Sequence, residues 1–313
     1  MKIELPRGSG IGADVTGVDV KRMTDAEVDE LKAAVYRHKL LVLRDQSADE
    51  AAYLAFAKRL GTPQVYLQAN YHHPQYPEIF VSSNVLEDGR KVGVAGTGQY
   101  WHTDYQFMSA PLSTTLVYPQ ILPTHKRETY YIDMVRVYES LPARLRNRVD
   151  GLRAIHEAKW RYKLSADDID RALVDMLELI EAHAPPVSHP AVLKHPITGG
   201  PALYISSGFT TGFVGLSRDE NEELLNELLD FVERAEHVHT HTWQLGDILY
   251  WDNRTVIHKA STTPPGEQSK SYRIGVYDGH PFYTNGSEQE TRTTVEGVRL
   301  SWLTVPRRRN PTQ

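Results

Sequence analysis

The sequence predicts a mainly β protein with appended helices, arranged as a double-stranded β-helix of the jelly-roll, cupin-like kind. Short segments rich in β-branched and aromatic residues recur along the chain, whereas only a few stretches show the spacing of an amphipathic helix. A jelly roll closes its edges by wrapping two sheets face to face. The chain has 313 residues, 40% of them hydrophobic, and contains no repeat or linker, so we expect a single domain over residues 1–313 with a substantial core.

Two helices are expected near the N-terminus. Thr24 and Glu27 form a capping-box pattern before apolar positions with helical spacing, which predicts a helix to about His38. A continuous apolar strand should follow over residues 39–44. Ser47 and Glu50 repeat the capping pattern before a second helix, which Gly61 ends.

A stretch rich in Tyr, His, Pro and Gln follows, over about residues 62–98, with one expected strand at 78–83. Long loops without their own structure are usually functional or disordered, and we expect this one to be a lid over the site. The elements expected after it are strands at about 112–118, 128–133, 191–193, 202–205, 238–245, 247–251 and 271–277, and helices at about 135–148, 173–180 and 217–235. Residues 280–313 form a C-terminal extension that we expect to pack on the barrel or on another subunit.

Composition excludes several classes of function. A net charge of -5 and a pI near 6.3 argue against a general nucleic-acid or anionic-membrane surface, which needs clustered positive charge. No stretch approaches the roughly 20 apolar residues of a membrane span, and the first residues lack the apolar region of a secretory signal. The absence of Cys fits a reducing cytoplasm, where we expect the protein, and leaves only nitrogen and oxygen atoms as metal ligands.

The motif that carries the predicted chemistry is His102-x-Asp104. Side chains two apart in an extended segment point the same way, so an imidazole and a carboxylate can reach one ion together. With His258 as the third ligand they would form a two-His-one-carboxylate facial triad, which holds divalent iron and leaves one side open. A surface His is the competing interpretation of the short motif. His237, His239 and His241 also alternate onto one face and could mimic a metal site, but we expect them to lie on a solvated strand.

An expected strand after His258 carries a single arginine, Arg273. A guanidinium beside a metal with open positions suits a bidentate acidic co-substrate, because its planar fork matches a carboxylate. Metal and arginine together indicate a keto acid. A surface arginine paired with an acid is the alternative.

In this order and with these gaps, the four residues resemble the taurine/dichlorophenoxyacetate dioxygenase (TauD/TfdA) family of Fe(II)- and 2-oxoglutarate-dependent oxygenases. The resemblance extends through most of the chain, including residues 12–15, 40–46 and 56–61. It implies Fe(II) as the metal, and 2-oxoglutarate and O2 as co-substrates. It also implies that Thr129 helps Arg273 to hold the distal carboxylate of 2-oxoglutarate, although Thr129 also fits an ordinary strand residue.

Within the family, the chain is most similar to the non-haem iron isonitrile synthases. Tyr277 stands where the taurine enzyme has a second arginine for the sulfonate, so taurine is not the expected substrate. The resemblance implies instead that four residues contact the substrate: Tyr66, Tyr71, Arg127 and Lys163. The substrate would be an N-carboxymethyl β-amino (fatty) acid, which two oxidations with decarboxylation convert to an isonitrile. Leu67 departs from this pattern where a further Tyr is expected.

Two alternatives remain at this stage. One is a hydroxylase of another small carboxylic acid in the same family, and the other is a non-catalytic, cupin-like module that binds a small molecule. In all three cases the expected partner is a small molecule, a carboxylate for the enzymes, with no nucleic acid and no membrane. Association of identical chains is left open.

Overall fold

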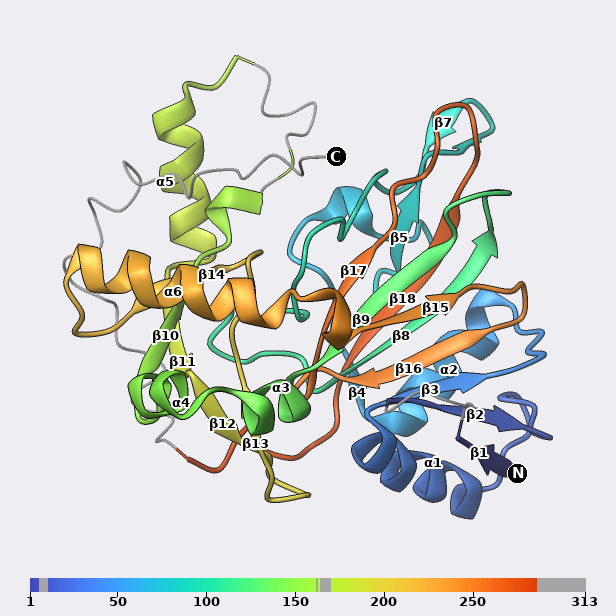
Figure 1. Cartoon of the computed structure of the whole chain (residues 1–313). Helices are drawn as coiled ribbons and strands as arrows, with labels where there is room; N and C mark the ends of the chain where they lie inside the picture. Colours follow the sequence, from blue (N-terminus) through green and yellow to red (C-terminus); the bar gives the residue numbers. More distant parts are fainter. Residues whose placement is uncertain (6–10, 162, 164–169, 286–313) are drawn as a thin grey trace.

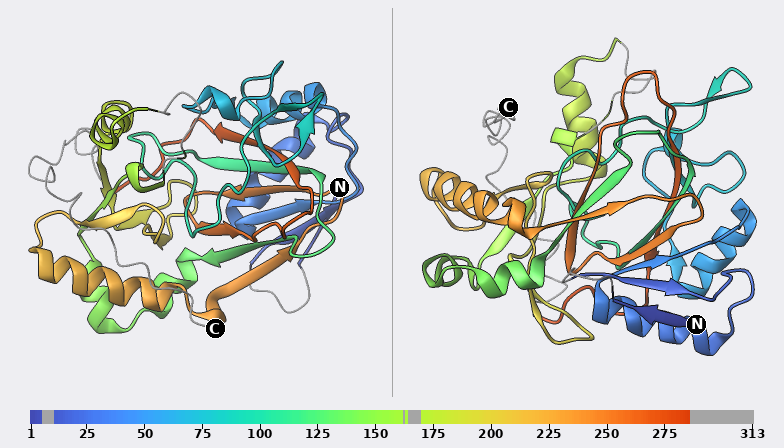
Figure 2. Two further views of the ribbon diagram at one scale, coloured as in Figure 1. Left: turned by 90° about the horizontal axis from the view of Figure 1, so that it is seen from above. Right: turned by 45° about the vertical axis from the view of Figure 1, so that its right-hand side comes forward.

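Two facing β-sheets form the centre of the protein (Figures 1 and 2). The computed structural model describes residues 1–5, 11–161, 163 and 170–285. The major sheet has the order β1 (Lys2–Glu4), β2 (Ala13–Thr16), β3 (Leu40–Leu43), β16 (Ile248–Asp252), β8 (Thr114–Ile121), β18 (Lys270–Tyr277) and β4 (Thr62–Pro63), with β5 (Phe80–Ser83) also paired to β18. The minor sheet has the order β15 (Val238–Thr242), β9 (Glu128–Asp133) and β17 (Val256–Ala260).

Apolar side chains pack in part of the space between the sheets. Leu40 and Trp251 of the major sheet pack with Tyr131 and Val256 of the minor sheet, and all four are essentially buried. Neighbouring strands in both sheets are antiparallel except for β2 and β3. Two sheets packed face to face around one core are the predicted jelly roll, and the predicted fold class is confirmed.

Helices α1 (Asp25–His38) and α2 (Glu50–Leu60) cover the outer face of the major sheet (Figure 1). The predicted capping box of α1 is present, because Thr24 accepts from the backbone of Glu27 and Glu27 accepts from that of Thr24. The prediction for α2 was wrong in one detail. Asp49, not Ser47, caps the helix by accepting a hydrogen bond from the Ala52 N–H.

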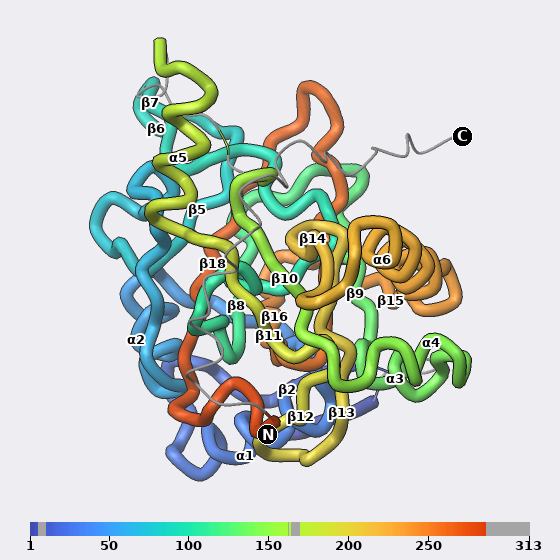
Figure 3. Tube along the Cα trace, turned by 90° about the vertical axis from the view of Figure 1, so that its left-hand side faces the viewer, coloured from blue at the N-terminus to red at the C-terminus, as the bar shows by residue number. Residues whose placement is uncertain are grey.

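A second group of elements lies on the opposite side of the molecule. It comprises α3 (Met134–Ser140), α4 (Ala143–Val149), α5 (Leu173–His183), α6 (Arg218–Val232), the small sheet β11 (Val187–Pro190), β10 (Arg153–His156) and β14 (Thr210–Phe213), and the pair β12 (Val192–Lys194) and β13 (Pro201–Leu203). Seen from that side, the small sheet lies between α5 and α6 (Figure 3). The single helix expected over residues 135–148 is two helices, because Pro142 lacks the N–H that would continue α3.

The stretch 62–98 contains more structure than the expected lid. Besides β4 and β5 it includes the 3₁₀ turn η1 (Ala69–Tyr71) and the hairpin β6 (Leu86–Glu87) and β7 (Arg90–Lys91). Both β4 and β5 pair with β18, the strand that carries Arg273. Part of the stretch is therefore a fixed edge of the major sheet.

The start of the C-terminal extension packs on the β12–β13 pair. Phe282 and Tyr283 contact buried Leu193 and Tyr204, and Thr284 donates to the Lys194 carbonyl. The rest of the extension lies outside the described residues. Among the helices that the structure describes, none is long and apolar enough to cross a membrane.

A buried ion pair ties the end of the major sheet to the turn before His258. The Arg254 guanidinium, which is fully buried, donates to both carboxylate oxygens of Asp278 at 2.8 and 3.0 Å. Burial opposes ionisation of Asp278, but Arg254 and Tyr36 lower the pKa of this carboxyl to about 2. The pair therefore stabilises the folded chain only while Asp278 is ionised.

We predict that Asp278→Asn lowers the free energy of unfolding by about 3–5 kcal/mol, because it removes the carboxylate that pairs with both ends of the buried guanidinium and leaves only Asp252, 3.6 Å away. Since the pKa of Asp278 is lower in the folded chain, the loss should be complete above the ordinary carboxyl pKa near 4 and should shrink as the pH falls towards 2. Urea unfolding at several pH values measures this. Asp29→Asn on exposed α1 is the matched control, and equal stability of the two variants at pH 7 would contradict the prediction.

Candidate active site

Two backbone segments far apart in the sequence meet at the end of the minor sheet. The His102 N–H donates to the His258 carbonyl at 3.0 Å, and the His258 N–H donates to the His102 carbonyl at 2.7 Å. His258 is on β17, whereas His102 lies outside any longer strand and is held by this isolated bridge. The bridge places the two imidazoles side by side, with 4.2 Å between ring centroids.

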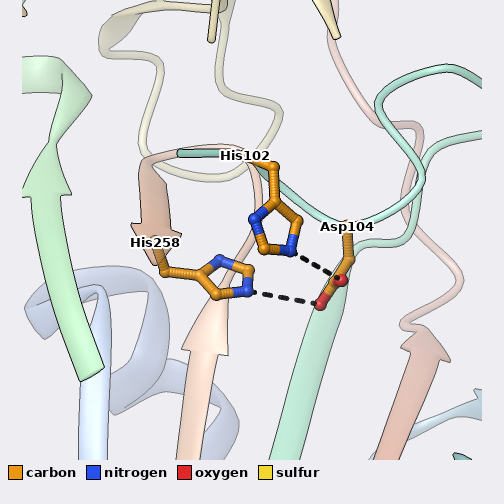
Figure 4. A group of neighbouring side chains, drawn as sticks. All are labelled: His102, Asp104 and His258. Atoms are coloured by element: carbon orange, nitrogen blue, oxygen red, sulfur yellow. Dashed lines mark ion pairs between the residues drawn. The ribbon is translucent and has the colours of Figure 1, made fainter. Parts of the chain in front are cut away.

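Asp104 completes a three-residue cluster with these imidazoles (Figure 4). Its carboxylate oxygens lie 3.8 Å from Nε2 of His102 and 4.0 Å from Nε2 of His258. One ligand atom from each residue lies within 4.8 Å of the others, and all three residues are buried. This is the geometry in which a single ion can bind to all three.

The protonation states of the cluster suit a divalent cation. Burial lowers the pKa of both His102 and His258, which favours the neutral rings that metals bind. Nδ1 of His102 lies 2.8 Å from the Tyr100 carbonyl, so an Nδ1–H can donate there and leave the Nε2 lone pair facing Asp104. Burial opposes ionisation of Asp104, but Arg273 and the two imidazoles lower the pKa of this carboxyl to about 2. Two neutral nitrogens and one carboxylate fit Fe(II).

A chain of hydrogen bonds orients Asp104 from behind. The Thr115 hydroxyl donates to its carboxylate at 2.7 Å and accepts from the Asn253 amide at 2.9 Å. The amide oxygen of Asn253 accepts from the Trp251 indole at 2.8 Å. Thr115 was not identified from the sequence, because nothing in the sequence distinguishes it from other β-branched residues.

Arg273 lies directly beside the cluster. Its guanidinium donates to Asp104 at 2.6 Å and lies over the Phe80 ring, 3.9 Å from the ring centroid. The contact with Phe80 follows from strand pairing, because Arg273 on β18 lies opposite Phe80 on β5. The side chain keeps 19% exposure, so one part of it faces open space.

A cavity of about 350 Å³ opens beside the cluster; we call it the barrel cavity. It is lined by both histidines of the cluster and by Arg273, Thr129 and Arg127. The Thr129 hydroxyl accepts from the Trp243 indole at 2.8 Å, which leaves its own proton for an acceptor in the cavity. The structure thus places the Arg273 guanidinium and the Thr129 hydroxyl at the wall of the same cavity.

A second space, of about 50 Å³, lies against His102, Asp104 and Arg273 and is called the lid cavity. Three of the four expected substrate residues line it, namely Tyr66, Tyr71 and Lys163. Lys163 donates to the carbonyls of Ala95 and Gly96 at 2.6 and 2.5 Å, so it ties this cavity to the stretch 62–98.

Arg127 is not among the residues that line the lid cavity. It is exposed, at the wall of the barrel cavity. The spacing of residues along the chain did not predict this separation. Arg127 lies two residues before Thr129, and both side chains line the barrel cavity.

The alternating histidines 237, 239 and 241 do not form a second metal site. The cluster at Asp104 is the only group of three potential ligands within the described part of the chain. His241 is buried, 3.3 Å from Asp247, and Nδ1 of His237 faces the Val232 carbonyl. The expectation of a solvated strand was wrong for His241, because its side chain packs against Trp243.

A jelly roll with two imidazoles, one carboxylate and an adjacent arginine at its end defines the class of non-haem iron oxygenases that use a keto acid. Comparison of the sequence with protein families gives the same class. The profile of the taurine catabolism dioxygenase TauD, TfdA family matches residues 4–274, and the chain belongs to this family.

Individual relatives agree with this assignment. The chain is 31% identical over 278 residues to a pentalenolactone F synthase of Streptomyces arenae, across 86% of this chain and 92% of that protein. It is 30% identical over 297 residues to an alpha-ketoglutarate-dependent sulfate ester dioxygenase of Pseudomonas putida, across 93% and 94% of the two chains. A taurine dioxygenase structure from Burkholderia xenovorans superimposes with a TM-score of 0.72 at 26% identity, across 91% and 95%.

The protein is therefore an Fe(II)- and 2-oxoglutarate-dependent dioxygenase. The predictions of an enzyme and of its iron, 2-oxoglutarate and O2 are confirmed, and the alternative of a non-catalytic module is not supported. Neither the family nor these relatives identify the substrate.

We expect His258→Ala to weaken divalent-metal binding by more than about a hundredfold, because losing a partner outside the ligand shell alone costs about 10–100-fold. Titration of the metal-free protein with Mn(II), followed by its electron paramagnetic resonance signal, measures the affinity. His280→Ala, which changes an exposed histidine outside the cluster, should bind as the wild type does. Wild-type affinity in His258→Ala would remove this residue from the site.

Proposed function

We propose that the enzyme converts an N-carboxymethyl β-amino (fatty) acid to an isonitrile by two successive oxidations with decarboxylation. The observation that carries the proposal is the lid cavity, where Lys163, Tyr66 and Tyr71 lie against the metal cluster. Burial lowers the pKa of Lys163, and its ammonium contacts neutral carbonyls. An anionic substrate would give this cation a counter-charge, and the two hydroxyls would orient it.

The overall reaction balances with two equivalents of each co-substrate. R–NH–CH2–COOH, two O2 and two 2-oxoglutarate give R–N≡C, three CO2, two succinate and two H2O. Iron bound by His102, Asp104 and His258 would supply, with 2-oxoglutarate and O2, the oxidant that removes hydrogen from the N-carboxymethyl group. Lys163 holds the substrate in the lid cavity so that this methylene is the one presented.

Arg273 and Thr129 are assigned to 2-oxoglutarate. The barrel cavity brings the guanidinium and the hydroxyl to one wall beside the metal ligands. A metal ion at Asp104 competes with Arg273 for the same carboxylate, so metal binding makes the guanidinium available to the distal carboxylate of the keto acid. Arg273 lines both the barrel cavity and the lid cavity, so co-substrate and substrate would occupy adjoining spaces.

The second candidate is a hydroxylase of another small carboxylic acid, which stops after one oxidation. The separation of Arg127 from Lys163 favours it, because the four residues expected around one substrate do not line one cavity. Arg127 remains a proposed substrate contact only if the substrate reaches into the barrel cavity. The stoichiometry distinguishes the candidates, since the isonitrile synthase releases two succinates per isonitrile and the hydroxylase releases one per alcohol.

We predict that Arg273→Gln weakens 2-oxoglutarate binding by roughly tenfold to a hundredfold, because a hydrogen-bonded charge contributes about 1.5–3 kcal/mol. Thr129→Val should weaken 2-oxoglutarate binding less, by about 0.5–1.5 kcal/mol or up to roughly tenfold, because it removes one neutral hydrogen-bond donor. Anaerobic titration of the Fe(II) protein with 2-oxoglutarate, followed by the visible charge-transfer band of the chelate, measures both. Unchanged affinity in Arg273→Gln would overturn its assignment.

We predict that Lys163→Ala lowers kcat/KM for N-carboxymethyl-3-aminobutanoic acid by about tenfold to a hundredfold, because a charged hydrogen bond is lost. The 2-oxoglutarate band should be retained, since Lys163 does not line the barrel cavity. Lys58→Ala on the exposed side of α2 is the matched control. Wild-type turnover by Lys163→Ala, or succinate release without isonitrile, would contradict isonitrile formation.

A further inference from the structure

An apolar cavity of about 230 Å³ lies beneath α5, and we call it the helix cavity. It adjoins the lid cavity, because five residues line both: Tyr66, Tyr100, Phe107, Arg161 and Phe209. Its far wall comes from α5 and the residue after it, with Leu179, Ile180 and Ala184. A molecule held at Lys163 therefore has a second space to enter on the side away from Arg273.

Two of the polar side chains around this cavity, Arg161 and His183, already have partners. The Arg161 guanidinium donates to the carbonyls of Ser207 and Gly208 and lies over the Tyr100 ring, 4.4 Å from its centroid. Nδ1 of His183 faces the Leu179 carbonyl at 2.8 Å. The rest of the wall is mainly aliphatic and aromatic, so the cavity favours an apolar group.

We propose that the helix cavity holds the unbranched apolar tail of the substrate while its carboxylate end lies at Lys163 in the lid cavity. This tail site extends the proposed function. It depends on that function only for the placement of the carboxylate head group at Lys163. Tyr100 and Phe209 line both cavities, and Phe209 also packs edge-to-face on His102. The tail thus leaves the metal centre along aromatic rings and ends against α5.

The volume sets the length of the tail. An apolar cavity of about 150 Å³ holds benzene, with its six non-hydrogen atoms. By the same ratio the helix cavity holds a chain of about nine carbon atoms. Longer tails must displace α5 or extend into solvent, so each additional methylene adds little binding free energy.

The test uses simple carboxylic acids from butanoic to tetradecanoic acid, bound to the metal-free protein and measured by calorimetry. Each added methylene should tighten binding by about fourfold, from burial of about 0.8 kcal/mol per CH2, until the tail reaches about nine carbons. Affinity should then level off. These acids lack the N-carboxymethyl group, so the result is independent of isonitrile formation.

Two variants should move this plateau in opposite directions. Ala158→Leu adds three carbon atoms to the cavity wall, so affinity should stop increasing at a chain about three methylenes shorter. Leu179→Ala removes three carbon atoms, so affinity should keep increasing for about three more methylenes. Ala182→Leu, exposed on α5 and outside the cavity, is the matched control and should leave the plateau in place. Thermal unfolding checks that each variant is folded.

Each outcome separates this inference from the proposed function. A plateau that shifts with Ala158→Leu supports the tail site even if no isonitrile is formed. Isonitrile formation with affinities that do not depend on chain length, or with a plateau unmoved by both cavity variants, overturns it. Tighter binding of phenylacetic acid than of octanoic acid would also overturn it, because the cavity would then prefer an aromatic ring to an unbranched alkyl chain.

Discussion

The reciprocal backbone hydrogen bonds between His102 and His258 are the constraint on which the site depends. The segment around His102 would not hold its imidazole in place alone, because His102 belongs to no longer strand. The bridge anchors it to β17, whose own position is determined by pairing with β9. The facing sheets therefore place the two nitrogen ligands, and Asp104 follows two residues after the first of them. Backbone bonds are well suited to this task because they do not compete with the side chains for the metal.

The charges of Asp104 and Arg273 determine which groups lie beside that backbone bridge. A buried carboxylate needs a partner, and Asp104 has Arg273 on one side and the hydroxyl of Thr115 on the other. The guanidinium therefore neutralises the anion. Arg273 also lines both the barrel cavity and the lid cavity. In the proposed function, this one residue would release Asp104 to a metal ion and bind the acidic co-substrate in the barrel cavity.

The sequence predicted those elements whose stabilising contacts join residues close together in the chain. The capping box at Thr24 and Glu27 was recognisable because its partners are three residues apart. The break at Pro142 is equally local, but helical periodicity on both sides masked it. The strands β10, β11 and β14 were missed, because short strands away from the main sheets carry little alternation and depend on their neighbours for pairing.

The sequence by itself determined the family, the jelly roll and the candidate metal-binding residues, because ligand chemistry is limited to few residue types and the motif His102-x-Asp104 is local. Only the tertiary structure decided which side chains share a cavity. It separated Arg127 from Lys163 and brought Thr115 to Asp104, and no spacing along the chain predicts either result. The reason is physical: a strand residue's direction is set by register and pairing, and these are fixed by contacts between segments distant in the sequence.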